Sequence, residues 1–273
     1  MGRIKATLLV TALLLKHFII FAAPDTTIKL NPVKFIPGSY TAFYTDNLNN
    51  TYLLNTNNQV KKLDDKYDSA AVFNDVRRYG DIYSLDVSNP LKIIVYYKDF
   101  NTILVLDRFL NPRNTIDLRK YGILQAKAVA QSYDNNYWIF DELDSKIKKL
   151  DDNGNILLES ADFRMLFAEQ YQPVQIIDND GLLYLYDPAN VWLVFDYYGA
   201  FKQRIQVKGW RDVQVTGKNV QGHDAAFIYF ANPKALDIQQ VKTNIDLAGV
   251  IKLQKTGNKF AVLTKQGLSI YSL

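Results

Sequence analysis

Short runs of hydrophobic residues recur along the chain, and polar residues that favour turns separate them. Runs of this length that are rich in Val, Ile, Tyr and Phe are typical of β-strands. The clearest example is the segment 134–156, where YWIFD and KIKKLD precede Asp152-Asn153-Gly154. Asn and Gly tolerate the positive φ that a tight hairpin turn requires. The pattern therefore predicts antiparallel strands joined by short turns.

The same pair of strands recurs at a nearly fixed interval. Similar segments occupy 49–68, 91–111 and 180–201. The residue that closes the second strand of each segment is Asp64, Asp107, Asp151 and Asp196, at intervals of 43, 44 and 45 residues, and Gln239 follows after 43 more. A repeat of about 44 residues built from strands is typical of β-propeller blades, which bury their faces against neighbouring blades.

The repeat predicts an all-β, six-bladed β-propeller that forms a single domain over residues 24–273. Five four-stranded blades are expected at about 39–75, 80–118, 123–160, 173–207 and 211–248. The sixth blade has three strands of its own, GVIKLQK, KFAVLTK and LSIYSL. Thr26–Ile36 alternates like a strand and has no partner nearby, so we expect it to supply the fourth strand and close the ring. Residues 161–173 lack alternation and predict a short helix or loop.

The first 23 residues resemble a secretory signal peptide. A positively charged start, MGRIK, precedes the apolar run ATLLVTALLL and a stretch that ends in small residues. Lys16 and His17 interrupt the apolar part, and Pro24 disfavours cleavage after Ala23, so an uncleaved anchor is the alternative. The uninterrupted run is shorter than the ~20 residues that span a membrane. The expected location is therefore periplasmic.

Composition excludes several classes of site and partner. The chain has no cysteine, which excludes disulfides, thiol catalysis, Cys-ligated metals and a lipid anchor on an N-terminal Cys. Its formal net charge is +4, and three of the cations lie in the leader. The remainder is close to neutral, so no nucleic-acid partner is expected.

Few residues suggest catalysis. The only histidines are His17 and His223, and we expect His223 to lie in an exposed loop at 217–225. Polar groups recur after the first strand of a blade, namely Asp86 with Asn89, Asp134 with Asn135, and Asp178 with Asn179 and Asp180. Such groups can bind calcium or act as acids and bases, but they are also the usual turn residues. No catalytic residue, metal or cofactor is predicted, and a calcium-dependent hydrolase or lyase acting on a sugar or lactone is the alternative.

The connections between blades are the more promising surface. They would place one set of cations and aromatic rings around one rim: Arg77, Arg78, Tyr79, Arg119, Lys120, Tyr121, Arg164, Phe167, Lys208, Trp210 and Arg211. Arg and aromatic residues anchor protein interfaces, so this rim is the predicted surface for a protein partner. A packing role for the rings is an equally weighted interpretation. Among the tryptophans, only Trp210 is expected to be exposed enough to stack on a sugar, because Trp138 and Trp192 lie within predicted strands.

Blades two to four resemble a family of exported propeller-like proteins of Bacteroidetes. The resemblance rests on VSNPLKIIVYYKDFNTILVLD, SYDNNYWIFDE, KIKKLDDNGN and YDPANVWLVFDYYGAF, and it covers nearly all of the chain after the leader. It implies a link to the plug subunit that closes the periplasmic mouth of the type IX secretion translocon. The function implied is non-enzymatic binding, with a large outer-membrane barrel as the partner.

Overall fold

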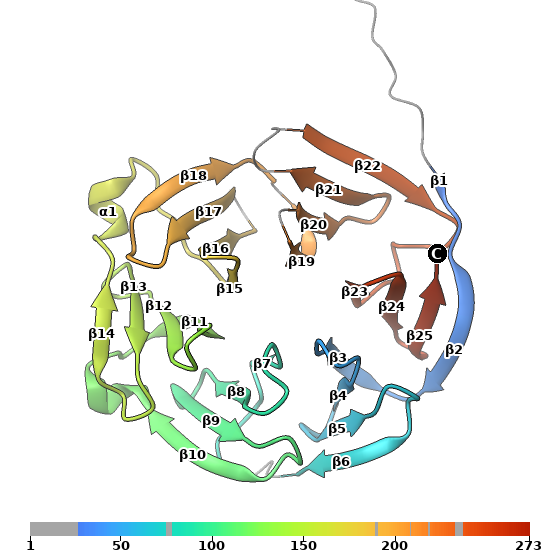
Figure 1. Cartoon of the computed structure of the whole chain (residues 1–273), viewed down its shortest axis with the longest axis horizontal. Coiled ribbons are helices and arrows are strands. Elements are labelled where there is room, and N and C mark those ends of the chain that lie inside the picture. Colours follow the sequence, from blue (N-terminus) through green and yellow to red (C-terminus); the bar gives the residue numbers. More distant parts are fainter. Residues whose placement is uncertain (1–26, 75–77, 189–190, 208, 218, 233–236) are drawn as a thin grey trace, which may run out of the picture.

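Six sheets, five of them with four strands and one with five, surround a central axis in the described part of the computed structural model (Figure 1). The structure describes residues 27–273 except 75–77, 189–190, 208, 218 and 233–236. The predicted leader, Arg77 and Lys208 therefore lie outside the described residues. Each sheet is antiparallel within its blade, and the blades follow one another in chain order around the ring. The predicted six-bladed β-propeller is confirmed.

The strands of the first three blades match the predicted segments. Blade 1 contains β3 (Tyr40–Thr45), β4 (Thr51–Asn55), β5 (Val60–Leu63) and β6 (Ser69–Phe73). Blade 2 contains β7 (Ser84–Asp86), β8 (Ile93–Tyr97), β9 (Thr102–Leu106) and β10 (Pro112–Asp117), followed by the short helix η1 (Leu118–Tyr121). Blade 3 contains β11 (Ala126–Gln131), β12 (Tyr137–Asp141), β13 (Lys146–Leu150) and β14 (Ile156–Glu159).

A short helix, α1 (Phe163–Leu166), connects blades 3 and 4, as the sequence predicts. Blade 4 contains β15 (Gln175–Asn179), β16 (Leu182–Asp187), β17 (Val191–Asp196) and β18 (Phe201–Ile205). Blade 5 contains β19 (Arg211–Thr216), β20 (Asn219–His223), β21 (Ile228–Asn232) and β22 (Asp237–Thr243). Blade 6 contains β23 (Lys252–Thr256), β24 (Lys259–Thr264) and β25 (Gly267–Ser272). Among the described residues, no helix combines the length and the apolar composition needed to cross a membrane.

The N-terminal segment closes the ring, as predicted. Strand β2 (Asn31–Pro37) pairs antiparallel with β25 and becomes the outermost strand of blade 6. The preceding strand β1 (Thr27–Ile28) pairs parallel with β22 of blade 5, so this segment joins the last two blades (Figure 1). Between the two strands, the side chain of Asn244 accepts a hydrogen bond from the Leu30 N–H at 2.7 Å and donates one to the Leu30 carbonyl at 3.0 Å.

The repeated aspartates hold the turns between the third and fourth strands. Asp107 accepts backbone hydrogen bonds from Phe109 at 2.8 Å and from Asn111 at 2.9 Å. Asp64, Asp151 and Asp196 make the same pair of contacts with the residues two and four positions ahead. An Asp that satisfies its own turn stabilises that turn. The repeat that reveals the blades is thus a repeat of turn geometry.

Blade 5 departs from the predicted strands. Residues 219–223, expected in an exposed loop, form strand β20, and His223 is fully buried. The third strand ends at Asn232, and Gln239 lies in the fourth strand opposite Phe230. The extension of the Asp series to Gln239 was therefore wrong. The strand NVQGH carries one aliphatic side chain, and its burial depends on hydrogen bonds to β19 that its hydrophobic pattern does not show.

Candidate functional site

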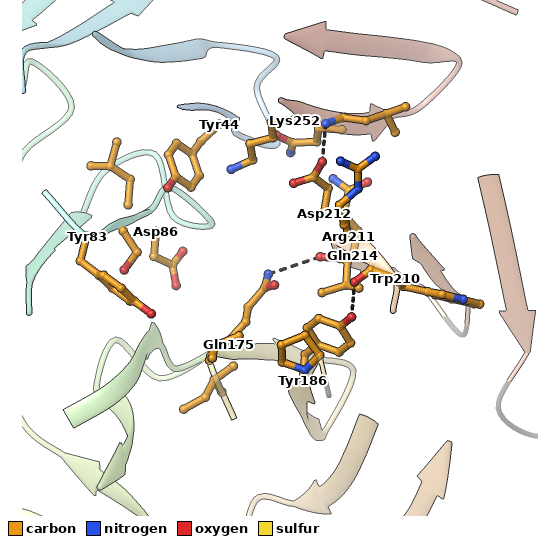
Figure 2. A pocket seen from close by; sticks show the side chains of 18 of the residues that line it. Tyr44, Tyr83, Asp86, Gln175, Tyr186, Trp210, Arg211, Asp212, Gln214 and Lys252 are labelled. Atoms are coloured by element: carbon orange, nitrogen blue, oxygen red, sulfur yellow. Dashed lines mark hydrogen bonds between the residues drawn. The ribbon is translucent and has the colours of Figure 1, made fainter. Parts of the chain in front are cut away.

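An axial cavity of about 500 Å³ lies inside the ring of innermost strands (Figure 2). This volume is in the range of small-molecule sites. The labelled residues around it are Tyr44, Tyr83, Asp86, Gln175, Tyr186, Trp210, Arg211, Asp212, Gln214 and Lys252. They come from β3, β15, β16, β19 and β23, from β7 and the residue before it, and from the residue before β19.

The cavity lies toward one face of the ring, which we call the connection face. This face carries the connections between blades and the turns between second and third strands, because the strands of each blade alternate in direction. Tyr83 and Arg211 lie where innermost strands begin, and Pro188 follows the second strand of blade 4. The opposite face, the turn face, carries the remaining hairpin turns. The predicted rim and the cavity therefore share one face.

Lys252 is the cation closest to the centre of this site. Its Nζ lies 3.5 Å from the centre of the Tyr44 ring, and Figure 2 shows it between Tyr44 and Asp212. A cation over an aromatic face is stabilised by the ring quadrupole. Burial lowers the pKa of Lys252 to about 8, although the Asp212 carboxylate acts in the opposite direction. Lys252 therefore begins to lose its proton only slightly above neutral pH.

The two carboxylates of the cavity link neighbouring blades. Asp212 Oδ2 lies 2.7 Å from His223 Nε2 and accepts a hydrogen bond from the Leu253 N–H of blade 6 at 2.8 Å. Asp86 accepts hydrogen bonds from the Ser88 N–H at 2.9 Å and, in blade 3, from the Gln131 N–H at 2.7 Å. Buried carboxylates that accept two such bonds are well satisfied. These groups stabilise the ring itself.

Tyr44 and Tyr83 present phenol groups to the same cavity. Burial raises the pKa of Tyr44 to about 12, while a hydrogen bond with the Leu85 backbone acts in the opposite direction. Tyr44 is therefore neutral at physiological pH. Tyr83 is 41% exposed at the mouth of the cavity, and the Nζ of Lys98 lies 4.8 Å from its ring centre.

The five cations of the predicted rim that the structure describes are exposed, but two of them have local partners. Arg119 pairs with Asp117 at 2.8 Å and Arg164 pairs with Asp162 at 2.6 Å, each within one connection. Exposed pairs of this kind contribute little to stability, and they reduce the charge available to a partner. Arg78 and Lys120 are exposed without a carboxylate partner within 4.0 Å among the described residues, and Arg211 lies at the cavity.

The aromatic members of the rim mainly pack against the blades. Tyr79 lies 5.2 Å from Tyr97 between ring centres, and Tyr121 covers Gly154. Phe167 packs in a cluster with Phe163, Tyr171, Phe195 and Phe201. Trp210 is 6% exposed and stacks on Tyr229 at 4.9 Å. The expectation that Trp210 offers an exposed sugar platform was wrong, whereas the predicted burial of Trp138 and Trp192 is confirmed.

Five of the repeated Asp and Asn residues line a second depression, of about 510 Å³, on the turn face: Asn89, Asn135, Asp178, Asn179 and Asp180. Asp178 accepts hydrogen bonds from Trp138 Nε1 at 2.9 Å, from the Tyr133 N–H at 3.1 Å and from the Tyr197 hydroxyl. Asp134 pairs with Lys149 at 2.6 Å. Within the described part of the chain, no three His, Cys, Asp or Glu side chains are grouped to hold a metal ion. The calcium interpretation thus has no ligand set among these residues.

Sequence reasoning missed most of the residues that line the cavity. Asp212 and Gln214 alternate along β19, and Lys252 and Gln254 alternate along β23. Polar residues at alternate positions of an innermost strand face the axis, because side chains alternate across a strand. That period of two within the first strand of each blade is the signal that could have identified them.

No family model and no curated protein matches the sequence. Similar solved structures include a streptogramin B lyase, with a TM-score of 0.60, 14% identity, and coverage of 85% of this chain and 78% of that one. The β-propeller domain of Cps50 (Swd1) from Myceliophteria thermophila has a TM-score of 0.60 at 9% identity, with coverage of 89% and 99%. The extracellular domain of a putative hybrid two-component system of B. thetaiotaomicron has a TM-score of 0.60 at 13% identity, with coverage of 88% and 34%. At these identities the likeness concerns the β-propeller fold alone.

Proposed function

We propose that this chain is a non-enzymatic β-propeller that binds a protein partner on its connection face. The observation that carries this proposal is a set of exposed apolar side chains on the connection face. They lie in connections or second–third turns: Tyr83, Phe100, Leu124, Leu143, Met165, Leu166 and Ile251, each between 41% and 85% exposed. Aromatic residues and Met are enriched in protein interfaces. Four blades contribute to the set, so a partner would contact several blades at once.

Cations on the same face favour a partner with acidic groups at its periphery. Arg78, Lys120 and Arg211 are exposed. They lie on three different connections, whereas Arg119 and Arg164 are neutralised locally. Polar rims of this kind around an apolar centre select partners and raise association rates more than they raise affinity.

Export to the periplasm and a specific partner are part of the same proposal. The leader pattern supports export, and the resemblance to exported propellers of Bacteroidetes supports the outer-membrane barrel of the type IX translocon as the partner. In this role the connection face would cover the periplasmic mouth of the barrel. The support for that partner is the sequence resemblance.

Affinity purification of the tagged protein from envelope extracts tests both levels of the proposal. Met165→Glu places a charge on an 85% exposed side chain of the connection face. Tyr198→Glu is the matched control, because Tyr198 is also 85% exposed but lies on the turn face between β17 and β18. We expect the Met165 variant to recover at least about tenfold less partner and the Tyr198 variant to recover the normal amount.

The opposite pattern, with loss of partner in the Tyr198 variant and normal recovery in the Met165 variant, would place the interface on the turn face and refute the proposed connection-face interface. Recovery of partners that include no outer-membrane barrel would refute the translocon assignment and leave the binding face standing.

A further inference from the structure

The hydrogen-bonding groups around the axial cavity are unbalanced. Most of its acceptor atoms have partners in the protein: Asp86 accepts at both carboxylate oxygens, Asp212 Oδ2 has two nitrogen partners, and Gln214 Oε1 accepts from Gln221 Nε2 at 2.8 Å and from the Lys255 N–H at 3.0 Å. Occupied acceptors have little left to offer a cationic or donor-rich ligand.

The donors around the cavity are not occupied in the same way. Across the described residues, Lys252 Nζ has no hydrogen bond and no carboxylate oxygen within 4.0 Å. The hydroxyl of Tyr83 also has no hydrogen-bond partner within this part of the chain. Arg211 makes one contact, from Nη2 to the Leu247 carbonyl at 3.4 Å. A partly buried ammonium group without a hydrogen-bond partner is costly, and an anion hydrogen-bonded to it reduces that cost.

The residues that line the cavity indicate how polar the rest of the ligand would be. The lining also includes Val129, the rings of Tyr44 and Tyr186, and the aliphatic residues Leu85, Val174, Ile176, Val213 and Leu253, which alternate with the polar residues along the chain. Apolar walls with a few directed polar groups are typical of sites for small organic molecules, whereas a free inorganic anion would gain nothing from them. The volume of about 500 Å³ admits such a molecule beside Lys252.

We propose that the axial cavity binds a small organic carboxylate with an apolar body, and that its carboxylate pairs with Lys252 while the body contacts the aliphatic walls. Tyr83, at the mouth, donates its free hydroxyl to the same ligand. The site shares Tyr83 and Arg211 with the edge of the protein-binding surface, whereas Lys252 faces the axis, and the site does not depend on the identity of a protein partner.

Lys252 has the properties that such a site requires. Burial holds the pKa of its ammonium near 8, so the group is charged over much of the neutral range and poorly solvated. The other titratable or charged groups that line the cavity are Tyr44, Tyr83, Asp86, Tyr186, Arg211 and Asp212. An anion bound at Lys252 raises its pKa, so binding takes up protons near pH 8.

Calorimetric titration with phenylacetate tests the proposal, with phenylacetamide as the uncharged match and acetate as the match without an apolar body. Phenylacetate is expected to bind at least roughly tenfold more tightly than either, because a charge-assisted hydrogen bond and buried apolar area each contribute at this scale. Its affinity should fall as pH rises above about 8, where Lys252 loses its proton.

Three variants test whether a loss of phenylacetate affinity comes from the missing Lys252 charge or from unfolding. Lys252→Met should lose at least roughly tenfold in phenylacetate affinity, and Lys252→Arg should keep most of it, because the cation is retained. Lys255→Met is the matched control on the same strand, since Lys255 Nζ donates to the Gly257 carbonyl at 2.7 Å and does not line the cavity. Circular dichroism checks that each variant is folded.

Any of three results would overturn the proposal. These are no phenylacetate binding to the folded wild type at about 10 mM, equal affinity for phenylacetamide, and unchanged affinity in Lys252→Met. Equal affinity for acetate would overturn the part of the proposal that gives the ligand an apolar body.

Discussion

Closure of the ring depends on a close backbone approach at Gly267, and replacing this residue by Ala should weaken the closure. Gly267 pairs with Pro37 at the end of the β2–β25 ladder and has a φ of +144°. A Cβ atom at this position would lie 2.3 Å from the Ile36 carbonyl oxygen and 2.9 Å from the Pro37 Cα. Both contacts are with backbone atoms, which cannot rotate away as a side chain can.

Two costs set the size of the effect. An Ala at this φ costs about 1–2 kcal/mol of conformational strain. Relief of the overlap requires β2 to move from β25, which adds about 1–3 kcal/mol as in other overpacked sites. The expected loss in the free energy of unfolding is therefore about 2–5 kcal/mol, with a midpoint of about 3–4 kcal/mol.

Gly257→Ala is the matched control. Gly257 has a φ of +59° in the β23–β24 turn, and nothing lies within 4 Å of its added Cβ. It should incur the conformational cost alone, about 1 kcal/mol. The difference of about 2–3 kcal/mol corresponds to a Tm lower by roughly 5–10 °C in the Gly267 variant.

Thermal unfolding followed by circular dichroism measures this difference, and amide hydrogen exchange locates it. Protection of residues 31–37 should fall in Gly267→Ala and be retained in Gly257→Ala. Equal Tm values for the two variants, with unchanged protection of β2, would show that the close approach of β2 to β25 does not limit stability.

Two further predictions concern charged groups inside the blades. Burial alone would raise the pKa of Asp107, but hydrogen bonds from the Asn111 backbone and the Arg113 guanidinium outweigh it and lower the pKa to about 2. Because this pKa is below the unfolded value of about 4, the stabilisation by the Asp107 carboxylate is present above pH 4 and is lost as pH falls toward 2. The Tm difference between wild type and Asp107→Asn should therefore shrink between pH 4 and pH 2. A Tm difference that stays constant over this range would contradict the prediction. Asp141, 1% exposed, lies 2.8 Å from the buried Lys148, so Asp141→Ala should lower the free energy of unfolding by about 3 kcal/mol in urea titrations. A loss below about 1 kcal/mol would show that Asp144, the other carboxylate beside Lys148, compensates.

Sequence and structure agree where the determining interactions are local. The Asp that closes a strand bonds to its own turn, as Asp107 does, so its spacing could be read without knowing any distant neighbour. The alternation in Thr26–Ile36 and the missing strand of blade 6 together predicted closure, because an unpaired edge must be covered.

They disagree where burial depends on a distant partner. His223 was expected in an exposed loop, but Asp212 satisfies its Nε2 and allows β20 to be buried. Trp210 was expected at the rim, but Tyr229 of another strand covers its ring. Neither partner could be assigned from hydrophobic periodicity, which records only which side chains avoid water.

The amino-acid sequence by itself determined most of the strands outside blade 5, the repeat, the number of blades and the closing strand, because each of these follows from periodicity and turn chemistry within about 44 residues. Only the tertiary structure decided which residues meet at the axis. Lys252 and Asp86 are far apart in the chain, and the ring brings both to one cavity. The environment of these two side chains depends on how the six innermost strands are placed relative to one another, and the sequence of a single repeat does not specify that placement.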